Sequence, residues 1–522
     1  MITLKNLRLP LKYTDDELKY ATSKALKINA KDIKEFSVKR LSVDARKKND
    51  VHYTATINVT INGNEKGITS KCKNAEISIN NKYNFKSNKK LAHKPVIIGA
   101  GPAGLFCGLM LARCGAEPII IERGECVENR TKTIDLFFAD GKLNPKSNIQ
   151  FGEGGAGTFS DGKLNTGIND IRARFVLEEF VAHGAPKEIL IDAKPHIGTD
   201  KLKGTIINIR KEIESLGGIF LFNTTVTDLI VSIDGIKGVC IDSNHSKDVI
   251  ATDNVILAIG HSARDTFAML KEKGIDMQPK AFSIGVRIEH LREDIDECQY
   301  GKARHLLGAA DYKVNTHLKD GRGVYSFCMC PGGHVVNASS EAGMLCTNGM
   351  SYHARDGKNS NSAILVGITP DDFYSNDVLD GIKLQREIEK NTYNAIGNNI
   401  APIQCVGNFL GNDIHYANKI EPTIRPGYEH YNISTLFPDY ISESLKEGLC
   451  NLGERMSAFK DMAAILTASE TRSSSPVRIV RNETFQSVSC KGLYPCGEGA
   501  GYAGGIMSAA VDGIKCAEAI LT

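Results

Sequence analysis

The segment from Val96 to Ile121 has the hydrophobic pattern of a strand, a helix and a second strand. Val96 to Ile98 is a run of three β-branched apolar residues, typical of a strand that is buried on both faces. A glycine-rich turn and a long apolar run follow, and Pro118 to Ile121 reads as the next strand. Glycines, Arg113 and Glu117 interrupt the apolar run, so it does not predict a membrane span.

The pattern on either side of this segment divides the chain into four parts. Residues 1–90 predict a small α+β domain of β-α-β-β order, and the polar, Lys-rich residues 80–94 predict a linker. Helices are predicted at 170–183, 200–216, 378–396 and 441–459, and short strands between 218 and 259. We expect a nucleotide-binding domain at 94–276, an inserted α+β domain at 277–480, and a return to the first fold at 481–522.

The turn after the first apolar strand has the spacing of a dinucleotide-binding motif. Gly99 permits the tight turn, Gly101 lets the backbone approach a pyrophosphate, and Gly104 lets the helix pack on the strand. Glu122 follows 21 residues after Gly101, where a carboxylate meets the ribose of an adenosine. Because strand, turn, helix and acid are all in register, we favour a dinucleotide site over a plain tight turn.

Two further glycine-rich segments extend this interpretation. Residues 151–165 interleave glycines with Thr158, Asp161 and Lys163, which predicts backbone shaped to a planar or anionic ligand rather than a flexible loop. Residues 497–506 form a second glycine turn before the last predicted helix. A flavin needs such a second helix start near its ring, although a simple glycine-rich loop is the alternative.

Composition restricts the class of protein. A chain of 522 residues with 42% hydrophobic and 24% charged residues is a globular protein of more than one domain. Lys and Arg outnumber Asp and Glu before Lys94, but aromatics are sparse there, so a solvated basic face is favoured over RNA binding. The 14 cysteines and the absence of a signal-peptide pattern predict a cytoplasmic protein with free thiols and no membrane partner. The sequence does not predict an oligomeric state.

These motifs together resemble the glutathione-reductase-type FAD proteins, in the branch that includes p-hydroxybenzoate hydroxylase. Ala258-Ile259-Gly260 stands where that group closes its FAD domain, and Gly497-Glu498 stands where a Gly-Asp turn meets the ribityl chain. The segments 147–166, 257–267 and 470–481 resemble more narrowly a bacterial family of uncharacterised FAD-dependent dehydrogenases, or NAD(P)/FAD-dependent oxidoreductases. The implied fold is α/β: an FAD-binding Rossmann domain, an inserted substrate or cap domain, and a small ferredoxin-like N-terminal domain.

The resemblance also implies which residues contact FAD. The expected contacts are Gly99, Gly101, Pro102, Ala103, Gly104, Glu122, Arg123, Arg130, Thr158, Val226, Gly260, Gly497, Glu498, Gly504, Gly505 and Ile506. Arg130 lies in a stretch that must return toward the nucleotide, so it either contacts phosphate or lies in solvent.

Catalytic candidates come from motifs expected around the flavin ring. We name Lys163, His261 and Arg472 first, with Asp161, Glu470 and Arg478 as further candidates. Arg472 and Arg478 flank a serine-rich loop and could hold a substrate carboxylate through the guanidinium fork, or each could be a structural ion pair.

The cysteines and the missing second nucleotide motif limit the chemistry. Cys328 and Cys330 could be redox groups or metal ligands, but buried thiols are favoured and no metal is predicted. Without a second fingerprint, either NAD(P)H docks transiently or the substrate itself reduces FAD. We expect an FAD-dependent oxidoreductase of an anionic small molecule; the alternative is an FAD-binding module that contacts RNA or protein.

Overall fold

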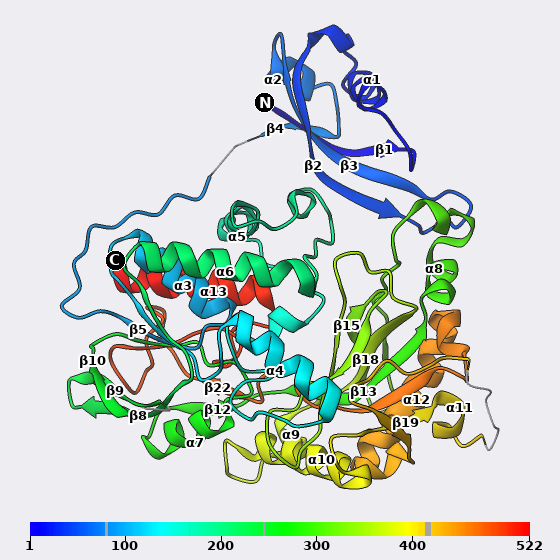
Figure 1. Cartoon of the computed structure of the whole chain (residues 1–522). Helices are drawn as coiled ribbons and strands as arrows, with labels where there is room; N and C mark the ends of the chain where they lie inside the picture. The colour runs from blue at the N-terminus through cyan, green and yellow to red at the C-terminus, as the bar shows by residue number, and fades with distance from the viewer. Residues whose placement is uncertain (79–81, 166, 244–245, 413–418) are drawn as a thin grey trace.

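The computed structural model describes residues 1–78, 82–165, 167–243, 246–412 and 419–522. The described chain forms a small N-terminal sheet above a larger body that contains two main sheets (Figure 1). Asn80, at the start of the predicted linker, and Thr166, at the end of one similar segment, lie outside the described residues.

A parallel sheet of five short strands carries the glycine turns. Its order is β23-β11-β5-β6-β7, with β5 at Val96–Ile98, β6 at Ile119–Ile121, β7 at Ile219–Leu221, β11 at Val255–Leu257 and β23 at Leu493–Pro495. Every neighbouring pair is parallel. The predicted strand pair around the first motif is confirmed, and β23 brings the end of the chain back beside β11.

One face of this sheet is covered by helices α3 (Pro102–Arg113), α5 (Ile171–Ala182), α6 (Thr199–Ser215) and α13 (Ile506–Leu521) (Figure 1). Gly513 of α13 lies so close to α3 that an added Cβ would be 2.1 Å from the carbonyl oxygen of Ala103. Helix α3 is apolar, yet no helix among the described residues combines the length and the apolar character needed to cross a bilayer.

The second main sheet has seven strands and is mostly antiparallel. Its order is β14-β15-β18-β13-β21-β19-β20, formed by Asn315–His317, Gly323–Cys330, Asn359–Ile368, Phe282–Leu291, Ile465–Glu470, Ala401–Cys405 and Tyr428–His430. Helices α10 (Asp380–Ile396) and α12 (Asp439–Arg455) pack against it. Both helices were predicted from their apolar spacing, with ends shifted by a few residues.

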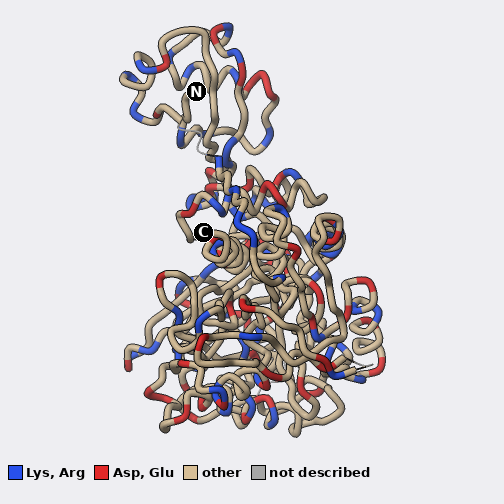
Figure 2. Tube along the Cα trace, turned by 90° about the vertical axis from the view of Figure 1, so that its left-hand side faces the viewer, with Lys and Arg blue, Asp and Glu red and all other residues tan. Residues whose placement is uncertain are grey.

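The N-terminal domain has the predicted β-α-β-β order and then adds a short helix and a fourth strand. Its elements are β1 (Ile2–Leu9), α1 (Asp15–Leu26), β2 (Ile33–Asp44), β3 (His52–Ile61), α2 (Glu65–Thr69) and β4 (Ala75–Ile77), in the sheet order β2-β3-β1-β4. Leu41 of β2 joins the body through backbone hydrogen bonds to Ile191 and Ala193 at 2.7 and 2.8 Å. Figure 2 shows acidic residues interleaved with the basic ones over this domain.

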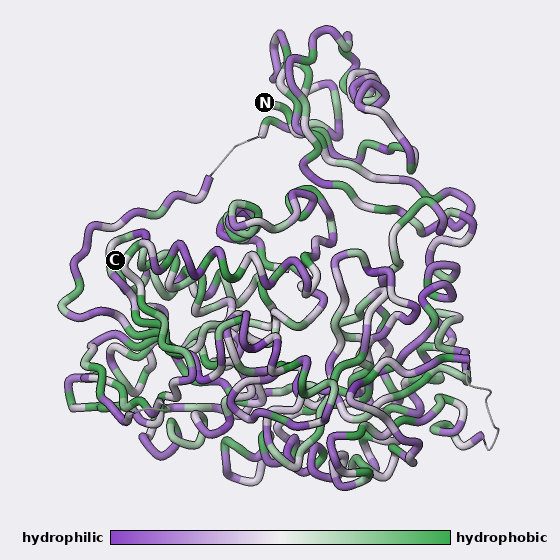
Figure 3. The backbone as a smooth tube through the Cα atoms, viewed as in Figure 1, coloured by the Kyte–Doolittle hydropathy of each residue, from purple (hydrophilic) through white to green (hydrophobic). Residues whose placement is uncertain are grey.

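The segment after the N-terminal domain is more firmly attached than a polar linker. The Tyr83 hydroxyl donates to Glu518 at 2.5 Å, Ser87 donates to the carbonyl of Leu521 at 2.8 Å, and the Tyr83 ring lies 4.8 Å from Phe175. Figure 3 shows the largely hydrophilic segment running outside the body toward the hydrophobic strand β5. The few aromatic residues of this segment therefore attach it to the C-terminal end of α13. We call residues 82–94 the strap.

The contact between α3 and α13 can be tested with one methyl group. Gly513→Ala places a Cβ against backbone that cannot rotate away, so we expect a loss of about 1–3 kcal/mol in the free energy of unfolding. Gly204→Ala on α6 is the matched control: an added Cβ there meets nothing within 4 Å, and higher helix propensity should leave stability equal or raised. Urea denaturation measures both, and equal midpoints would contradict the close contact.

Candidate functional site

One cavity of about 570 Å³ lies between the carboxyl ends of the parallel strands and the seven-stranded sheet. The turns after β5, β6, β11 and β23 form one side, and β15 contributes Ser326 to Cys328 on the other. Ligands of open α/β sheets bind at this edge of the sheet.

Two helices start at the cavity without a side-chain cap. Gly101 precedes α3 and Gly505 precedes α13, and neither of these N-cap residues provides a side-chain cap, although the Gly504 N–H donates to the Ser508 hydroxyl at 3.0 Å. A Cβ added at Gly101 would meet only the Cα of Gly155, at 3.9 Å. A Cβ added at Gly504 or Gly505 would meet nothing within 4 Å. The glycines thus leave open space in front of helix N–H groups that favour an anion.

Glu122 lines the cavity, but its carboxylate also holds three backbone turns together. It accepts hydrogen bonds from the N–H groups of Ala100, Gly124 and Gly152, each at 3.0 Å. Beside it, Arg123 pairs with Asp265 at 3.0 Å. Glu122 therefore sets the shape of this wall of the cavity. A contact with a ribose would be a further hydrogen bond beside the three that the carboxylate already accepts.

Arg130 lies neither at a phosphate nor in solvent, which corrects both alternatives for this residue. Its side chain is fully buried and donates to the carbonyl oxygens of Asn148, Ile149, Gly152, Glu153 and Gly155 at 2.7–3.2 Å. Burial lowers the pKa of Arg130 to about 10. The guanidinium orders the glycine-rich loop from within.

Three other expected FAD contacts also lie behind the cavity wall. Thr158 is fully buried and donates to the carbonyl of Glu153 at 3.3 Å. Gly104 packs against the carbonyl of Gly99, and Gly497 faces Ala103. The other expected contacts line the cavity: Gly99, Gly101, Pro102, Ala103, Glu122, Arg123, Val226, Gly260, Glu498, Gly504, Gly505 and Ile506.

His261 and Lys163 lie together in the same cavity. The Nδ1 atom of His261 is 3.1 Å from Glu498, and its Nε2 atom is buried without a partner among the described residues. The ammonium of Lys163 is 3.0 Å from Asp161. Burial alone would raise the pKa of Asp161, but the charges of Lys163 and Arg355 outweigh it and hold that pKa well below its usual range.

Arg472 reaches the cavity, but its guanidinium is already engaged. It donates to the buried carboxylate of Glu389 at 2.7 and 3.0 Å, and Arg264 pairs with the same carboxylate at 2.7 Å. The Arg472 side chain is only 3% exposed. The fork expected to hold a substrate carboxylate instead neutralises Glu389 of α10, as in the structural ion-pair alternative.

Arg478 does not take part in the cavity. Its side chain is exposed and stacks on Tyr502, with the guanidinium carbon 5.3 Å from the ring centre. The two arginines thus do not form, in this structure, the joint carboxylate site that was one of the alternatives for them.

The sequence interpretation missed Arg287, which lies fully buried behind the cavity. Arg287 makes two bonds to Glu470, at 2.6 and 2.8 Å, and donates to the carbonyl oxygen of Cys328 at 3.2 Å. A charged residue in the middle of the apolar run Phe282–Ile288 was the available signal, because such a residue must find a buried partner.

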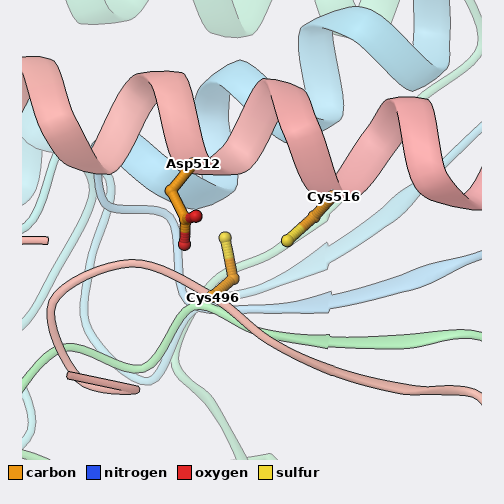
Figure 4. Close-up of side chains that lie close together, drawn as sticks. All are labelled: Cys496, Asp512 and Cys516. Atoms are coloured by element: carbon orange, nitrogen blue, oxygen red, sulfur yellow. The ribbon is translucent and has the colours of Figure 1, made fainter. Parts of the chain in front are cut away.

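A compact group beneath the second glycine turn has metal-like spacing. The ligand atoms of Cys496, Asp512 and Cys516 lie within 4.8 Å of one another, and Figure 4 shows these side chains converging between α13 and the turn. Asp512, however, pairs with Arg481 at 2.7 Å and accepts from the Gly497 N–H at 2.7 Å. The carboxylate thus has a structural role that closes the turn.

Comparison with known proteins associates the chain with FAD-dependent proteins. Residues 281–473 match the family described as "FAD-dependent protein, C-terminal domain-like", and residues 1–60 match a domain of unknown function. A Clostridium beijerinckii protein described as uncharacterized is 44% identical over 529 residues, covering 100% of this chain and 98% of that protein.

Two solved flavoprotein structures are similar at greater distance. A geranylgeranyl bacteriochlorophyll reductase-like protein of Thermoplasma acidophilum is 10% identical, with 82% of this chain and 77% of that chain covered and a TM-score of 0.37. The FAD complex of glycerol-3-phosphate dehydrogenase from Bacillus halodurans is 13% identical, with 83% and 66% covered and a TM-score of 0.35. Likenesses this distant carry no argument about the reaction.

The class that the matched domain supports is that of FAD-dependent flavoproteins. Within that class, the chain belongs to the same family as the Clostridium beijerinckii protein.

The structural role of Arg472 gives a stability prediction. Arg472→Lys removes the planar fork and leaves Glu389 short of a partner, so we expect about 3 kcal/mol lower unfolding free energy. Arg386→Lys is the control, because Arg386 pairs with Glu341 in a partly exposed position and should change stability by less than about 1 kcal/mol. Urea titrations of both variants measure their unfolding free energies. Equal values would contradict the structural role and restore Arg472 as a candidate for substrate binding.

Proposed function

We propose that the protein is an FAD-dependent oxidoreductase of a small anionic molecule. Residues 94–276 and 481–522 form its glutathione-reductase-type FAD-binding Rossmann domain, residues 277–480 its substrate domain, and residues 1–90 an appended ferredoxin-like domain. The observation that carries the proposal is that one cavity brings together the starts of α3 and α13, Lys163 and His261.

The cavity residues fit the parts of FAD. The N–H groups at the start of α3 suit the diphosphate, and the space left by Gly101 allows its close approach. The Glu498 carboxylate is an acceptor for a ribityl hydroxyl, and the start of α13 places positive potential at the cavity. Bound FAD would supply the electron transfer, while the chain binds and orients the reactants.

His261 and Lys163 are the groups suited to handle protons. The hydrogen bond to Glu498 fixes the orientation of the His261 ring, and the buried Nε2 atom is the ring nitrogen without a partner among the described residues. Lys163 keeps its charge beside Asp161, so it supports developing negative charge rather than acting as a base.

Lysines replace the arginines as the groups for an anionic substrate. Lys163, Lys194 and Lys313 line the cavity from three separate segments. Lys194 and Lys313 are both exposed, and Lys194 pairs with Asp311 at 2.8 Å. This arrangement supports attraction of a carboxylate or phosphate.

The described part of the seven-stranded sheet is mostly antiparallel, with β19 and β20 as a parallel pair, and so differs from the wholly parallel sheet of a second nucleotide domain. We therefore propose that the substrate exchanges electrons with the flavin faster than NAD(P)H does, and that any NAD(P)H contact is transient. The alternative of an RNA-binding flavin module would instead give salt-sensitive tRNA binding without flavin turnover.

Flavin binding is tested at Gly101. Gly101→Val projects a side chain into open cavity space, so the protein should fold normally and retain less than about a tenth of the flavin per chain, a loss equal to about 1.4 kcal/mol or more. The visible absorbance of the purified proteins measures this, with Gly204→Ala as the folded control. A folded Gly101→Val protein with full flavin would refute the diphosphate position.

The electron donor is tested by anaerobic stopped-flow absorbance. We expect rapid change of the flavin spectrum with one carboxylate- or phosphate-bearing compound from a metabolite panel, and slow, weakly saturable reduction by NADH or NADPH. Lys313→Ala should raise the concentration of that compound needed for half-saturation several-fold, because a positive charge at the cavity is lost. The effect should be no larger than that, because the position is exposed. Rapid reduction by micromolar NADPH would overturn the proposed donor.

A further inference from the structure

The end of strand β15 carries two cysteines in an irregular backbone. Phe327 pairs with Ala363 and Cys330 pairs with Asn361, so β15 contains one extra residue between them. Cys328, within this bulge, has a φ of 43°, which is uncommon for a residue other than glycine. Such strain concentrates at functional sites, where surrounding contacts hold it in place.

The surroundings hold this bulge firmly. Arg287 donates to the carbonyl oxygen of Cys328 at 3.2 Å, and the thiol of Cys330 lies 3.3 Å from the same oxygen. Cys328 is half-buried and lines the cavity, whereas Cys330 is buried behind it. One sulfur is therefore accessible from the cavity and the other is protected.

Positive charge surrounds the two thiols. The ammonium of Lys163 is 3.9 Å from the sulfur of Cys330, and Arg287 reaches the bulge from β13, which is separated from β15 by β18. The hydrogen bond with Cys330, followed by the charges of Lys163 and Arg287, outweighs burial and lowers the pKa of Cys328 to about 5. The other titratable groups around the pair are Asp161, Arg355, Glu470 and Tyr312.

We propose that Cys328 and Cys330 form a redox-active dithiol that closes to a disulfide inside the cavity and carries two electrons from a thiol-bearing substrate to the flavin. The proposal rests on the proposed function for its electron acceptor. It identifies the substrate class as a small anionic thiol, oxidised to its disulfide.

Each half of the cycle balances. When the pair closes, the Cys328 thiolate and the Cys330 thiol together lose one proton and two electrons and one S–S bond forms; oxidised flavin, when bound, would accept both electrons. A substrate thiolate then attacks Cys328, which forms a mixed disulfide and releases the Cys330 thiolate. A second substrate thiolate attacks the substrate sulfur of that mixed disulfide, so Cys328 leaves as a thiolate and the oxidised substrate is released.

The experiment measures the cysteines directly in the full-length protein. Purified protein is equilibrated anaerobically in glutathione buffers of graded reduced-to-oxidised ratio, blocked with N-ethylmaleimide in acid, digested and analysed by mass spectrometry. We expect a peptide lighter by two hydrogen atoms, with the bond located between positions 328 and 330 by fragmentation. Cys330→Ser should instead retain glutathione on Cys328, and Cys450→Ser, at an exposed thiol on α12, should leave the bond unchanged.

A second measurement needs no variant. Iodoacetamide at pH 6 should label Cys328 several-fold faster than Cys450 in the same molecules, because the thiolate is the reactive form and an ordinary thiol, with a pKa of about 8.5, is less than about 1% ionised there. Lys163→Met should slow labelling at Cys328 and leave Cys450 unaffected.

The outcomes separate this proposal from the proposed function. If the pair stays reduced at every glutathione ratio and Cys328 labels no faster than Cys450, the dithiol proposal fails even if the protein contains FAD. If the bond forms but the protein contains no flavin, the thiol chemistry stands and the proposed flavin function fails. Flavin reduction by dithiothreitol that is unchanged in Cys330→Ser would refute electron transfer through the pair.

Discussion

The close backbone contact between α3 and α13 is the constraint on which the cavity depends. Gly513 lies against the carbonyl of Ala103, and Gly104 lies against that of Gly99, so even a methyl group would separate these elements. The contact places the two helix starts in one cavity, although about 400 residues of chain separate them. A flavin dinucleotide needs such a convergence because the diphosphate at its centre and the flavin ring at one end must be held at the same time.

Around this contact, buried charges keep the loops in place. Glu122 closes three turns through backbone N–H groups, Arg130 gathers carbonyl groups of the glycine-rich loop, and Asp512 closes the turn after β23. A glycine-rich loop loses much conformational entropy on ordering, and charged side chains offset part of that cost by strong hydrogen bonds. Some of the polar residues that the sequence suggests as ligand contacts line the cavity, and others only hold its loops in place.

This difference between residues that line the cavity and residues that support its loops explains what could be predicted from the sequence. The β5–α3 unit was predicted because its glycines, apolar residues and Glu122 are close in sequence and each has a local physical reason. The role of Arg472 could not be predicted, because its partner Glu389 lies 83 positions earlier on a different element. Arg130 was misplaced for a similar reason: its acceptors are carbonyl groups, which no residue type reveals. The attached strap was also missed, because only Tyr83 and a few apolar neighbours interrupt its polar composition.

The strap joins the N-terminal domain to the same helix that opens onto the cavity. Tyr83 and Ser87 bind the last turn of α13, and the first turn of that helix begins at Gly505 in the cavity wall. A ligand that orders the first turn also stabilises the helix to which the strap is fastened, and thermodynamic reciprocity requires strap attachment to favour the ligand in return. Helix α13 would thus couple occupancy of the cavity to the tethering of the N-terminal domain.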